Sequence, residues 1–133
     1  VGGAQSRPLA WRAMMSVIGS WAVQGFAFFS VIEKSSGRWI GRLGPWCPEG
    51  WPGTEVGWGL LREAWGRGYA VEGSTAAIDW AFARLGWTEV IHTIGPENVR
   101  TTTSPMCTAR WVESAVCTLT DITEASGAST RLS

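Results

Sequence analysis

The sequence predicts an α/β fold, and three observations lead to this class. Two stretches, at residues 7–24 and 68–85, repeat apolar residues with the helical period of about 3.6. Four apolar or β-branched runs, separated by turn residues, lie between and after those stretches and are typical of strands. With 133 residues, the chain is long enough for one domain with a sizeable core.

The first predicted element is a helix that begins at Ser6-Arg7-Pro8, where a proline fits the first turn. It ends near Gln24-Gly25. Between these points one apolar stripe repeats with the helical period, and it consists of Leu9, Met14, Val17, Ile18 and Trp21.

A β-hairpin is predicted to follow the helix. Residues 26–33 form a strongly apolar strand, Ser35-Ser36-Gly37 forms the turn, and residues 38–46 form the second strand. Residues 47–53 are predicted to be a loop, because two prolines and two glycines would interrupt any ladder of strand hydrogen bonds.

Three further elements complete the pattern. Residues 54–61 form the next strand, residues 68–85 form the second helix, and residues 88–94 form a short β-branched central strand. The helix is predicted to bury one apolar face made of Val71, Ile78, Phe82 and Leu85.

The composition changes sharply near residue 101. Residues 1–100 contain nine of the ten tryptophans, whereas residues 101–133 contain thirteen serines or threonines in a third of that length. We therefore interpret residues 1–100 as a packed core and residues 101–133 as a polar, irregular segment of the same domain.

Charge and cysteine content exclude several classes of function. The formal net charge is zero, which gives no electrostatic reason to expect nucleic acid or an anionic membrane as a partner. No apolar run is long enough to span a bilayer. Three cysteines without a C-x-x-C pair, together with one histidine, predict neither a disulfide framework nor a metal centre. We expect a cytoplasmic protein without metal.

A glycine-rich turn leads from the predicted strand 54–61 into the predicted helix 68–85, and it is the most informative segment of the chain. Its residues are Gly66, Arg67, Gly68, Tyr69 and Ala70. The first amides of a helix lack intrahelical partners, and the helix dipole adds partial positive charge there. Small residues let the backbone approach a ligand closely. The turn is therefore predicted to hold a pyrophosphate through its amides.

Neither of two common phosphate motifs accounts for this turn. The chain has no G-x-x-x-x-G-K-[ST] sequence, and the third spaced glycine of a dinucleotide fingerprint is missing. The sequence Trp65-Gly66-Arg67-Gly68-Tyr69-Ala70 instead resembles motif A of the GNAT superfamily of N-acetyltransferases, Q/R-x-x-G-x-G/A. Trp65 replaces the usual first residue. The string WGRGYAVE and the PENVRT sequence at 96–101 resemble the RimJ/RimL-type branch.

The resemblance implies a mixed, mostly antiparallel central sheet flanked by helices. It also implies transfer of an acetyl group from acetyl-CoA to a primary amine, either a protein N-terminus or a small molecule. The cofactor-binding residues that it implies are Gly59, Leu60 and Leu61 for pantetheine, Gly66 to Ala70 for pyrophosphate, and Asn98 near the far side of the cofactor. Gly57 and Gly59 are consistent with a bulge or a close backbone approach.

Amine acetylation needs a group that accepts a proton from the nucleophile. Glu55 is the best candidate, because relatives often carry a carboxylate at the corresponding place; the alternative is a solvated glutamate at a strand end. His92 is the only histidine, and we favour a buried structural role over a catalytic one.

The abundant tryptophans are predicted mainly to pack the core and the loops. Trp46 and Trp51 are the two that we expect to line an acceptor cleft, with the loop 47–53 selecting the acceptor.

Two departures from the family pattern leave other readings open. The family's initial strand and helix are not recognisable before the first predicted helix. The residues after Thr101 do not resemble the family's next helix, as a shifted reading frame near residue 100 would explain. A missing strand would leave an exposed sheet edge, through which a homodimer could form. The alternatives to an active enzyme are an inactive CoA-binding or remnant fragment and, less favoured, a tryptophan-lined ligand-binding module.

Overall fold

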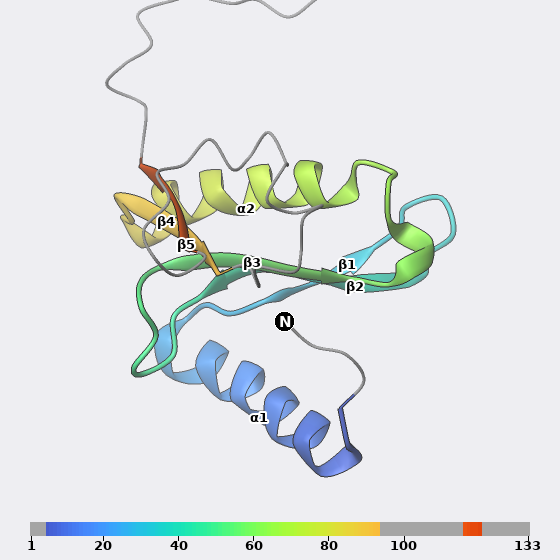
Figure 1. Cartoon of the computed structure of the whole chain (residues 1–133), viewed down its shortest axis with the longest axis horizontal. Helices are drawn as coiled ribbons and strands as arrows, with labels where there is room; N and C mark the ends of the chain where they lie inside the picture. The colour runs from blue at the N-terminus through green and yellow to red at the C-terminus, as the bar shows by residue number, and fades with distance from the viewer. Residues whose placement is uncertain (1–4, 94–115, 121–133) are drawn as a thin grey trace, which may run out of the picture.

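The computed structural model describes residues 5–93 and 116–120, which form a central sheet with one helix on each face (Figure 1). Helix α1 spans Arg7–Gln24 and helix α2 spans Tyr69–Leu85. The glycines directly after them, Gly25 and Gly86, adopt the left-handed conformation that ends a helix. Both predicted helices are confirmed to within about one residue.

Within the described residues, the sheet has five strands in the order β1-β2-β3-β4-β5. They are β1 Phe29–Ile32, β2 Trp39–Trp46, β3 Glu55–Leu60, β4 Glu89–Thr93 and β5 Val116–Thr120. All neighbouring pairs are antiparallel except β3 and β4, which are parallel. The mixed, mostly antiparallel sheet is thus confirmed. β1 and β5 are its edge strands.

The first strand is shorter than predicted, because the residues before it contact α1. The carbonyl of Phe26 accepts a hydrogen bond from Ser20 Oγ, and the carbonyl of Phe28 accepts one from Trp21 Nε1. These two carbonyls accept hydrogen bonds from side chains in the last turns of α1. Pairing with β2 therefore begins only at Phe29. Apolar character alone could not separate these two uses of the backbone.

The segment after residue 101 contributes a strand where the sequence predicts irregular structure. Strand β5 pairs with β4 from Glu89↔Thr120 to Thr93↔Val116. Its Val-Cys-Thr-Leu-Thr sequence alternates apolar and polar residues, a pattern that the high serine and threonine content of the segment obscured. The predicted domain boundary near residue 101 lies outside the described residues.

The core lies between the sheet and α2. Its centre consists of Leu43, Val56, Ala77, Ile78 and Val90. A methyl group added to Gly73 would stand 2.2 Å from Leu43 Cδ2, so the glycine lets the helix lie close to β2.

The predicted buried face of α2 is partly wrong. Ile78 is buried, but Val71 is 43% exposed, and the buried residues are Ser74, Ala77, Ile78 and Ala81. Small side chains occupy the contact, since they allow the close approach; a prediction based on large apolar residues therefore places the face incorrectly.

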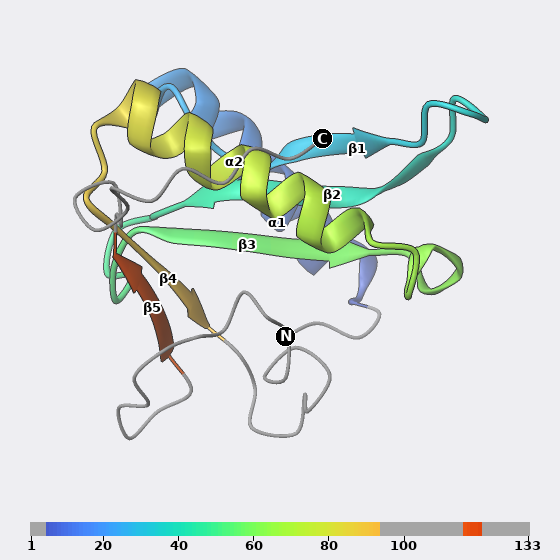
Figure 2. The ribbon, with the colours of Figure 1, turned by 90° about the horizontal axis from the view of Figure 1, so that it is seen from above.

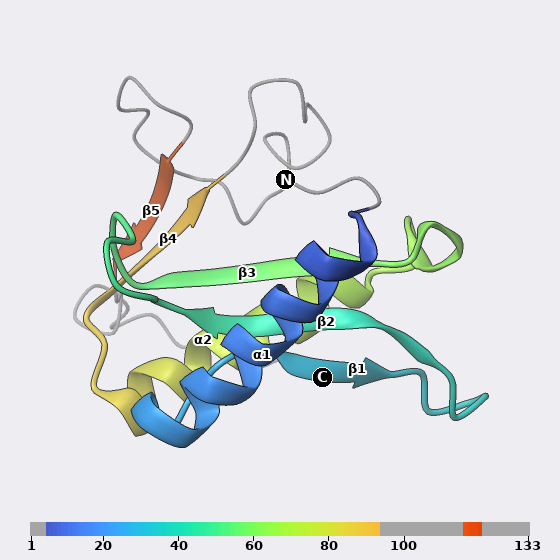
Figure 3. The same cartoon turned by 90° about the horizontal axis from the view of Figure 1, so that it is seen from below.

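Helix α1 lies on the opposite face of the sheet, as Figures 1 and 3 show, and it has no buried residue. The members of its apolar stripe are at most half-buried. Part of this stripe faces a cavity between α1 and the sheet. Among the residues that the structure describes, no helix is long and apolar enough to cross a membrane.

Candidate active site

The segment between β3 and α2 forms a compact turn that leaves main-chain N–H groups free. After β3, the short 3-10 helix η1, Arg62–Ala64, reverses the chain. Gly66 and Gly68 then adopt positive φ angles of 73° and 84°, which an L side chain rarely tolerates. A Cβ atom at either glycine would meet nothing within 4 Å, so the space in front of both glycines is open.

The amides at the start of α2 have no partner among the described residues. The first hydrogen bond of the helix runs from Glu72 N to Gly68 O, at 3.0 Å, and no side chain caps the N-terminus. The N–H groups of Tyr69, Ala70 and Val71 therefore remain available, together with those of the turn. This geometry is the one predicted for Gly66 to Ala70, and it suits an anion.

The side chains of Arg67 and Tyr69 turn away from these amides and bind Glu33, at the end of the first hairpin strand. Arg67 Nη1 lies 2.7 Å from Glu33 Oε1, and the Tyr69 hydroxyl donates to the same oxygen at 2.6 Å. The guanidinium also lies 4.9 Å from the centre of the Tyr69 ring. Arg67 and Tyr69 can therefore serve an anion through their main chain.

Glu33 is held as a carboxylate by its donors. Hydrogen bonds from Ser36 and Tyr69 and the charge of Arg67 lower the pKa of Glu33 to about 2. The same carboxylate raises the pKa of Tyr69, so the phenol stays protonated and continues to donate. This cluster, which we call the Glu33 clasp (Glu33, Ser36, Arg67 and Tyr69), fastens the turn to the β1–β2 hairpin.

Strands β3 and β4 diverge almost at once. They pair only at Glu55↔Ile91, where Ile91 N donates to Thr54 O at 2.8 Å. Figures 2 and 3 both show β4 running away from β3 toward its C-terminal end. The cavity extends along β3 beside this opening, since Val56 to Leu61 line it together with His92 and Thr93.

The side chains of Glu55 and His92 bind the two main-chain groups that would otherwise continue the hydrogen-bond ladder between β3 and β4. In a regular parallel pair, the next bond would join Thr93 N to Val56 O. Thr93 N instead donates to Glu55 Oε1 at 3.1 Å, and Val56 O lies 2.6 Å from His92 Nδ1. Both main-chain groups are satisfied while the strands separate, so Glu55 and His92 stabilise the opening.

The main-chain groups of β3 alternate between β2 and this opening. Leu61 N donates to Ile40 O at 2.8 Å, and Leu61 O accepts from Ala64 N at 2.9 Å. Gly59 O faces β2, because it would stand 2.4 Å from a Cβ on Gly41.

The pantetheine contacts of Gly59, Leu60 and Leu61 stay a prediction, but the main-chain directions favour a different set of residues. Leu61 has no free main-chain group, and the carbonyl of Gly59 faces β2. Alternation directs Leu60 and, in place of these two residues, Trp58 toward the opening. Leu60 O accepts from Trp65 Nε1 at 2.9 Å, which leaves its N–H available.

Of the two alternatives given for Gly57 and Gly59, the β2–β3 pairing shows no bulge, because its register is regular from Gly41↔Leu60 to Trp46↔Glu55. The close approach is real at Gly57, where a Cβ would stand 3.3 Å from the Phe28 ring and 3.4 Å from Glu55 Oε1.

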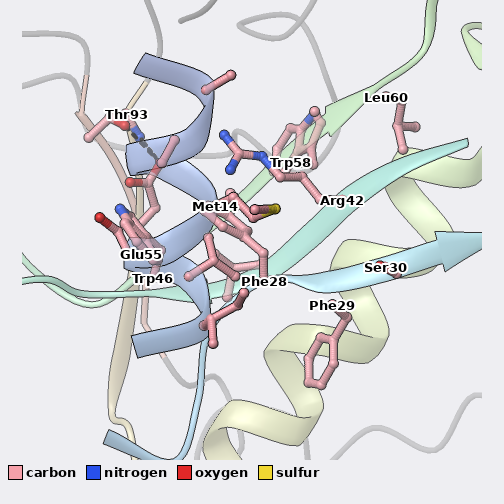
Figure 4. A pocket seen from close by; sticks show the side chains of 18 of the residues that line it. Met14, Phe28, Phe29, Ser30, Arg42, Trp46, Glu55, Trp58, Leu60 and Thr93 are labelled. Carbon is pink, nitrogen blue, oxygen red and sulfur yellow. Dashed lines mark hydrogen bonds between the residues drawn. The ribbon is translucent and has the colours of Figure 1, made fainter. Parts of the chain in front are cut away.

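Glu55 is buried, with 6% of its surface exposed, so the reading as a solvated strand-end glutamate is wrong. Thr93 Oγ1 donates to Oε1 at 2.7 Å, in addition to the Thr93 main chain, and Trp51 Nε1 donates to Oε2 at 2.6 Å. Figure 4 shows the carboxylate and Thr93 facing one another at the edge of the cavity. The carboxylate thus receives three hydrogen bonds.

His92 is 1% exposed and lies against the Trp58 ring, with 5.0 Å between the ring centres. Burial lowers the pKa of His92, and the nearby Glu55 carboxylate opposes that effect only in part. The imidazole is therefore neutral at pH 7. Its Nε2 atom has no hydrogen-bond partner in the described part of the chain.

The cavity between α1 and the sheet has a volume of about 860 Å³. Trp46 lines it and stacks on Phe28, with 4.9 Å between ring centres, and Arg42 lies 4.6 Å above the same Phe28 ring. Trp51 joins the lining from the loop 47–53. Aromatic rings, one buried carboxylate and an imidazole therefore surround a single space (Figure 4).

Sequence reasoning missed three side chains of this arrangement. Glu33 resembled an ordinary solvated hairpin residue, Thr93 resembled any β-branched strand residue, and Phe28 resembled core. No local pattern identifies them, because their partners lie far away in the sequence. Asn98, predicted to lie near the cofactor, falls outside the described residues.

Comparisons with known proteins agree with this geometry. Residues 1–103 match the family model described as an acetyltransferase (GNAT) domain. No curated protein matches the chain significantly.

Solved structures with a similar fold include an acetyltransferase from Agrobacterium tumefaciens, which has a TM-score of 0.72 and 24% sequence identity. That match covers 88% of this chain and 72% of the other. A ribosomal-protein-S5-alanine acetyltransferase from Vibrio fischeri has a TM-score of 0.59 and 20% identity, with 76% and 59% of the two chains covered.

The family match covers more than half of the chain, and the amides before α2 that lack a partner among the described residues lie in the turn that carries the motif resemblance. The chain therefore belongs to the GNAT acetyltransferase family and is an acyltransferase.

Proposed function

We propose that this protein transfers the acetyl group of acetyl-CoA to a primary amine. The observation that carries the proposal is the set of amides from Gly66 to Val71 that have no partner in the described part of the chain, at the positive end of the α2 dipole. Such amides bind a pyrophosphate without any cationic side chain. Acetyl-CoA is the acyl donor that GNAT acetyltransferases use.

The opening between β3 and β4 supports the same donor. Pantetheine is an extended arm with two amide groups, and the main chain of Trp58 and Leu60 faces the opening as a strand edge would. An arm bound there is held between the free amides before α2 and the carboxylate of Glu55. The residues proposed to hold acetyl-CoA are Trp58 and Leu60 for the arm, Gly66 to Ala70 for the pyrophosphate, and Asn98.

The cavity beneath α1 is proposed to receive the acceptor amine. A protonated amine is attracted by a buried carboxylate and by aromatic faces, and Glu55, Trp46 and Trp51 supply both at one place. The amine belongs to a protein N-terminus or to a small molecule. The WGRGYAVE and PENVRT sequences favour the RimJ/RimL-type branch.

The chemistry requires an acceptor for the proton of the amine. Glu55 and His92 are the two candidates that line the cavity. Both are buried, so either group would act away from bulk water.

Thermal shift with acetyl-CoA tests the binding site. A ligand present at 100 times its dissociation constant stabilises the folded state by about 2.7 kcal/mol. Gly68→Glu should abolish this shift, since it places bulk and negative charge in front of the amides.

Gly86→Glu is the matched control for this variant. Gly86 also has a left-handed φ, 66°, and nothing within 4 Å of its Cβ position, but it lies at the opposite end of α2. Both variants carry the same conformational cost and the same charge change. An acetyl-CoA shift that survives in Gly68→Glu, or that disappears equally in Gly86→Glu, would contradict the proposed pyrophosphate site.

An inactive CoA-binding protein is the second candidate, because the residues after Thr101 do not resemble the family's next helix. Thiol release measured over a panel of peptides and small amines separates the two. An active enzyme releases CoA only when amine is present, whereas an inert binder shows the thermal shift without amine-dependent release.

A further inference from the structure

We propose that His92 is the proton acceptor for the attacking amine, through its Nε2 atom, and that Glu55 is a positioning residue. This inference rests on the acetyl transfer proposed above and assigns its proton to one side chain. The geometry around the two groups distinguishes them.

The hydrogen bond of His92 fixes which ring nitrogen carries the hydrogen. Nδ1 lies 2.6 Å from the main-chain carbonyl of Val56, and a carbonyl oxygen can only accept. Nδ1 must therefore be protonated. Because burial keeps the ring neutral at pH 7, Nε2 carries no hydrogen and presents a basic lone pair.

That lone pair is unused. Nε2 is buried and has no hydrogen-bond partner among the residues that the structure describes. Buried polar atoms are nearly always paired, because an unpaired one costs about 1–3 kcal/mol. His92 lines the cavity together with Trp58 and Thr93, so a ligand N–H that enters the cavity is the partner that we propose for Nε2.

The Glu55 carboxylate, in contrast, already accepts hydrogen bonds on both oxygens. Its two carboxylate oxygens accept three hydrogen bonds, from the Thr93 main chain, the Thr93 hydroxyl and Trp51. One of these bonds, from Thr93 N, also occupies the main-chain group that would otherwise continue the β3–β4 pairing. A group that holds the opening cannot accept an incoming proton without weakening its own contacts. Its negative charge instead favours a protonated His92, as the direction of its effect on the His92 pKa shows.

The proton balance is simple. The ammonium form of the acceptor gives one proton to His92 Nε2 and becomes a neutral amine. Its nitrogen lone pair then forms the C–N bond while the thioester C–S bond breaks, and sulfur leaves with the electron pair. The remaining excess N–H proton passes to the thiolate, and His92 later returns its proton to solvent.

The first test reads the imidazole directly in the free protein. His92 is the only histidine of the chain, so its ring nitrogen signals in a ¹⁵N NMR spectrum need no assignment by mutation. At pH 7 we expect Nδ1 protonated and Nε2 bare. The opposite tautomer, or a charged ring at pH 7, would overturn the proposal.

The second test uses two variants that keep half of the imidazole each. His92→Asn can still donate to Val56 O but has nothing in place of Nε2, whereas His92→Gln places an amide near Nε2 without a basic group. His92→Asn, which keeps the hydrogen bond to Val56 O, should show the wild-type acetyl-CoA thermal shift. Amine-dependent thiol release should fall about 100-fold or more in both.

The pH profile separates a proton acceptor from a structural contact. In the wild type, kcat should rise with pH through a pKa below 6.5, since desolvation lowers the pKa of His92 and Glu55 is the charged group acting on it. Neither variant should show this rise of kcat with pH.

Wild-type rates and profile in either variant would refute the role of His92 while leaving acetyl transfer intact. A wild-type protein that shows neither the acetyl-CoA shift nor amine-dependent thiol release would instead refute the proposed function.

Discussion

The contacts of Glu55 predict a specific coupling between two substitutions that are separately harmful. Glu55→Gln retains the shape of the side chain but replaces one acceptor oxygen by an NH₂ donor. In wild type, Thr93 donates twice to Oε1 and Trp51 donates once to Oε2. Whichever way the new amide is oriented, its NH₂ group faces a donor: two wild-type hydrogen bonds are lost if it faces Thr93 and one if it faces Trp51.

The magnitude follows from the number of bonds lost. A hydrogen bond to a charged group contributes about 1.5–3 kcal/mol, and a buried donor left without an acceptor costs about 1–3 kcal/mol. The amide oxygen should face Thr93, because Thr93 offers two donors and Trp51, which is 38% exposed, can turn its N–H to water. We therefore expect Glu55→Gln to lower the free energy of unfolding by about 2 kcal/mol.

Trp51→Phe tests the reason for that cost. In the wild-type background it removes the bond to Oε2, whereas in the Glu55→Gln background it removes a donor that already faces a donor. The loss of aromatic packing is the same in both backgrounds. The effect of Trp51→Phe should thus be smaller by about 1 kcal/mol or more in the Glu55→Gln background, as measured from urea unfolding of the four proteins. Effects that add to within about 0.5 kcal/mol would show that Trp51 and Glu55 are not coupled.

Three other outcomes follow from the structure. Glu33→Gln should weaken the acetyl-CoA thermal shift, since a neutral amide binds Arg67 less well and fastens the turn before α2 less firmly; an unchanged shift would contradict the role of the Glu33 clasp. Because the pKa of Glu33 is lowered from 4.5 to about 2, its contribution to stability is fully present above pH 4.5 and is lost as the pH falls toward 2. The melting temperature of wild type should therefore fall more steeply than that of Glu33→Gln across this range, and parallel curves would refute the assignment. Gly73→Ala should lower the free energy of unfolding by about 1–3 kcal/mol through the contact with Leu43. Gly19→Ala, in open space within α1, should raise it by up to about 1 kcal/mol. Chemical denaturation measures both, and equal effects would mean that the α2–β2 contact is looser than described.

Helix limits and the locations of β1 to β4 could be predicted from the sequence because each depends on neighbouring residues, whereas β5 was missed. Proline near the first turn and glycine after the last turn mark α1, and both signals act locally. The buried face of α2 could not be predicted in the same way. It depends on how closely β2 approaches Gly73, and this distance is set by packing between segments that are far apart in the chain.

In the candidate site, too, local features could be predicted and contacts between distant segments could not. The free amides after Gly66 were predictable, since they result from a local turn and the start of a helix. The Glu33 clasp and the pairing of Glu55 with Thr93 were not, because each joins residues from different strands or from a strand and a helix. Glu55 itself was identified, but its burial follows only from the position of β4 and Trp51.

The arrangement of free main-chain groups also explains why an acyl carrier fits better than a simple anion. A phosphate ion would use only the amides before α2, and it would leave the open edge of β3 without a partner. That edge exists because Thr93 N and Val56 O bind side chains in place of one another. Binding these two main-chain groups to side chains gives up hydrogen bonds between β3 and β4, and an anion at the turn would not contact the edge that results. A ligand with a pyrophosphate at one end and an amide-bearing arm at the other uses both features, since β3 leads directly through η1 into α2. In the complex that we propose, the arm ends beside His92 and Glu55, the two groups considered above as acceptors of the amine proton.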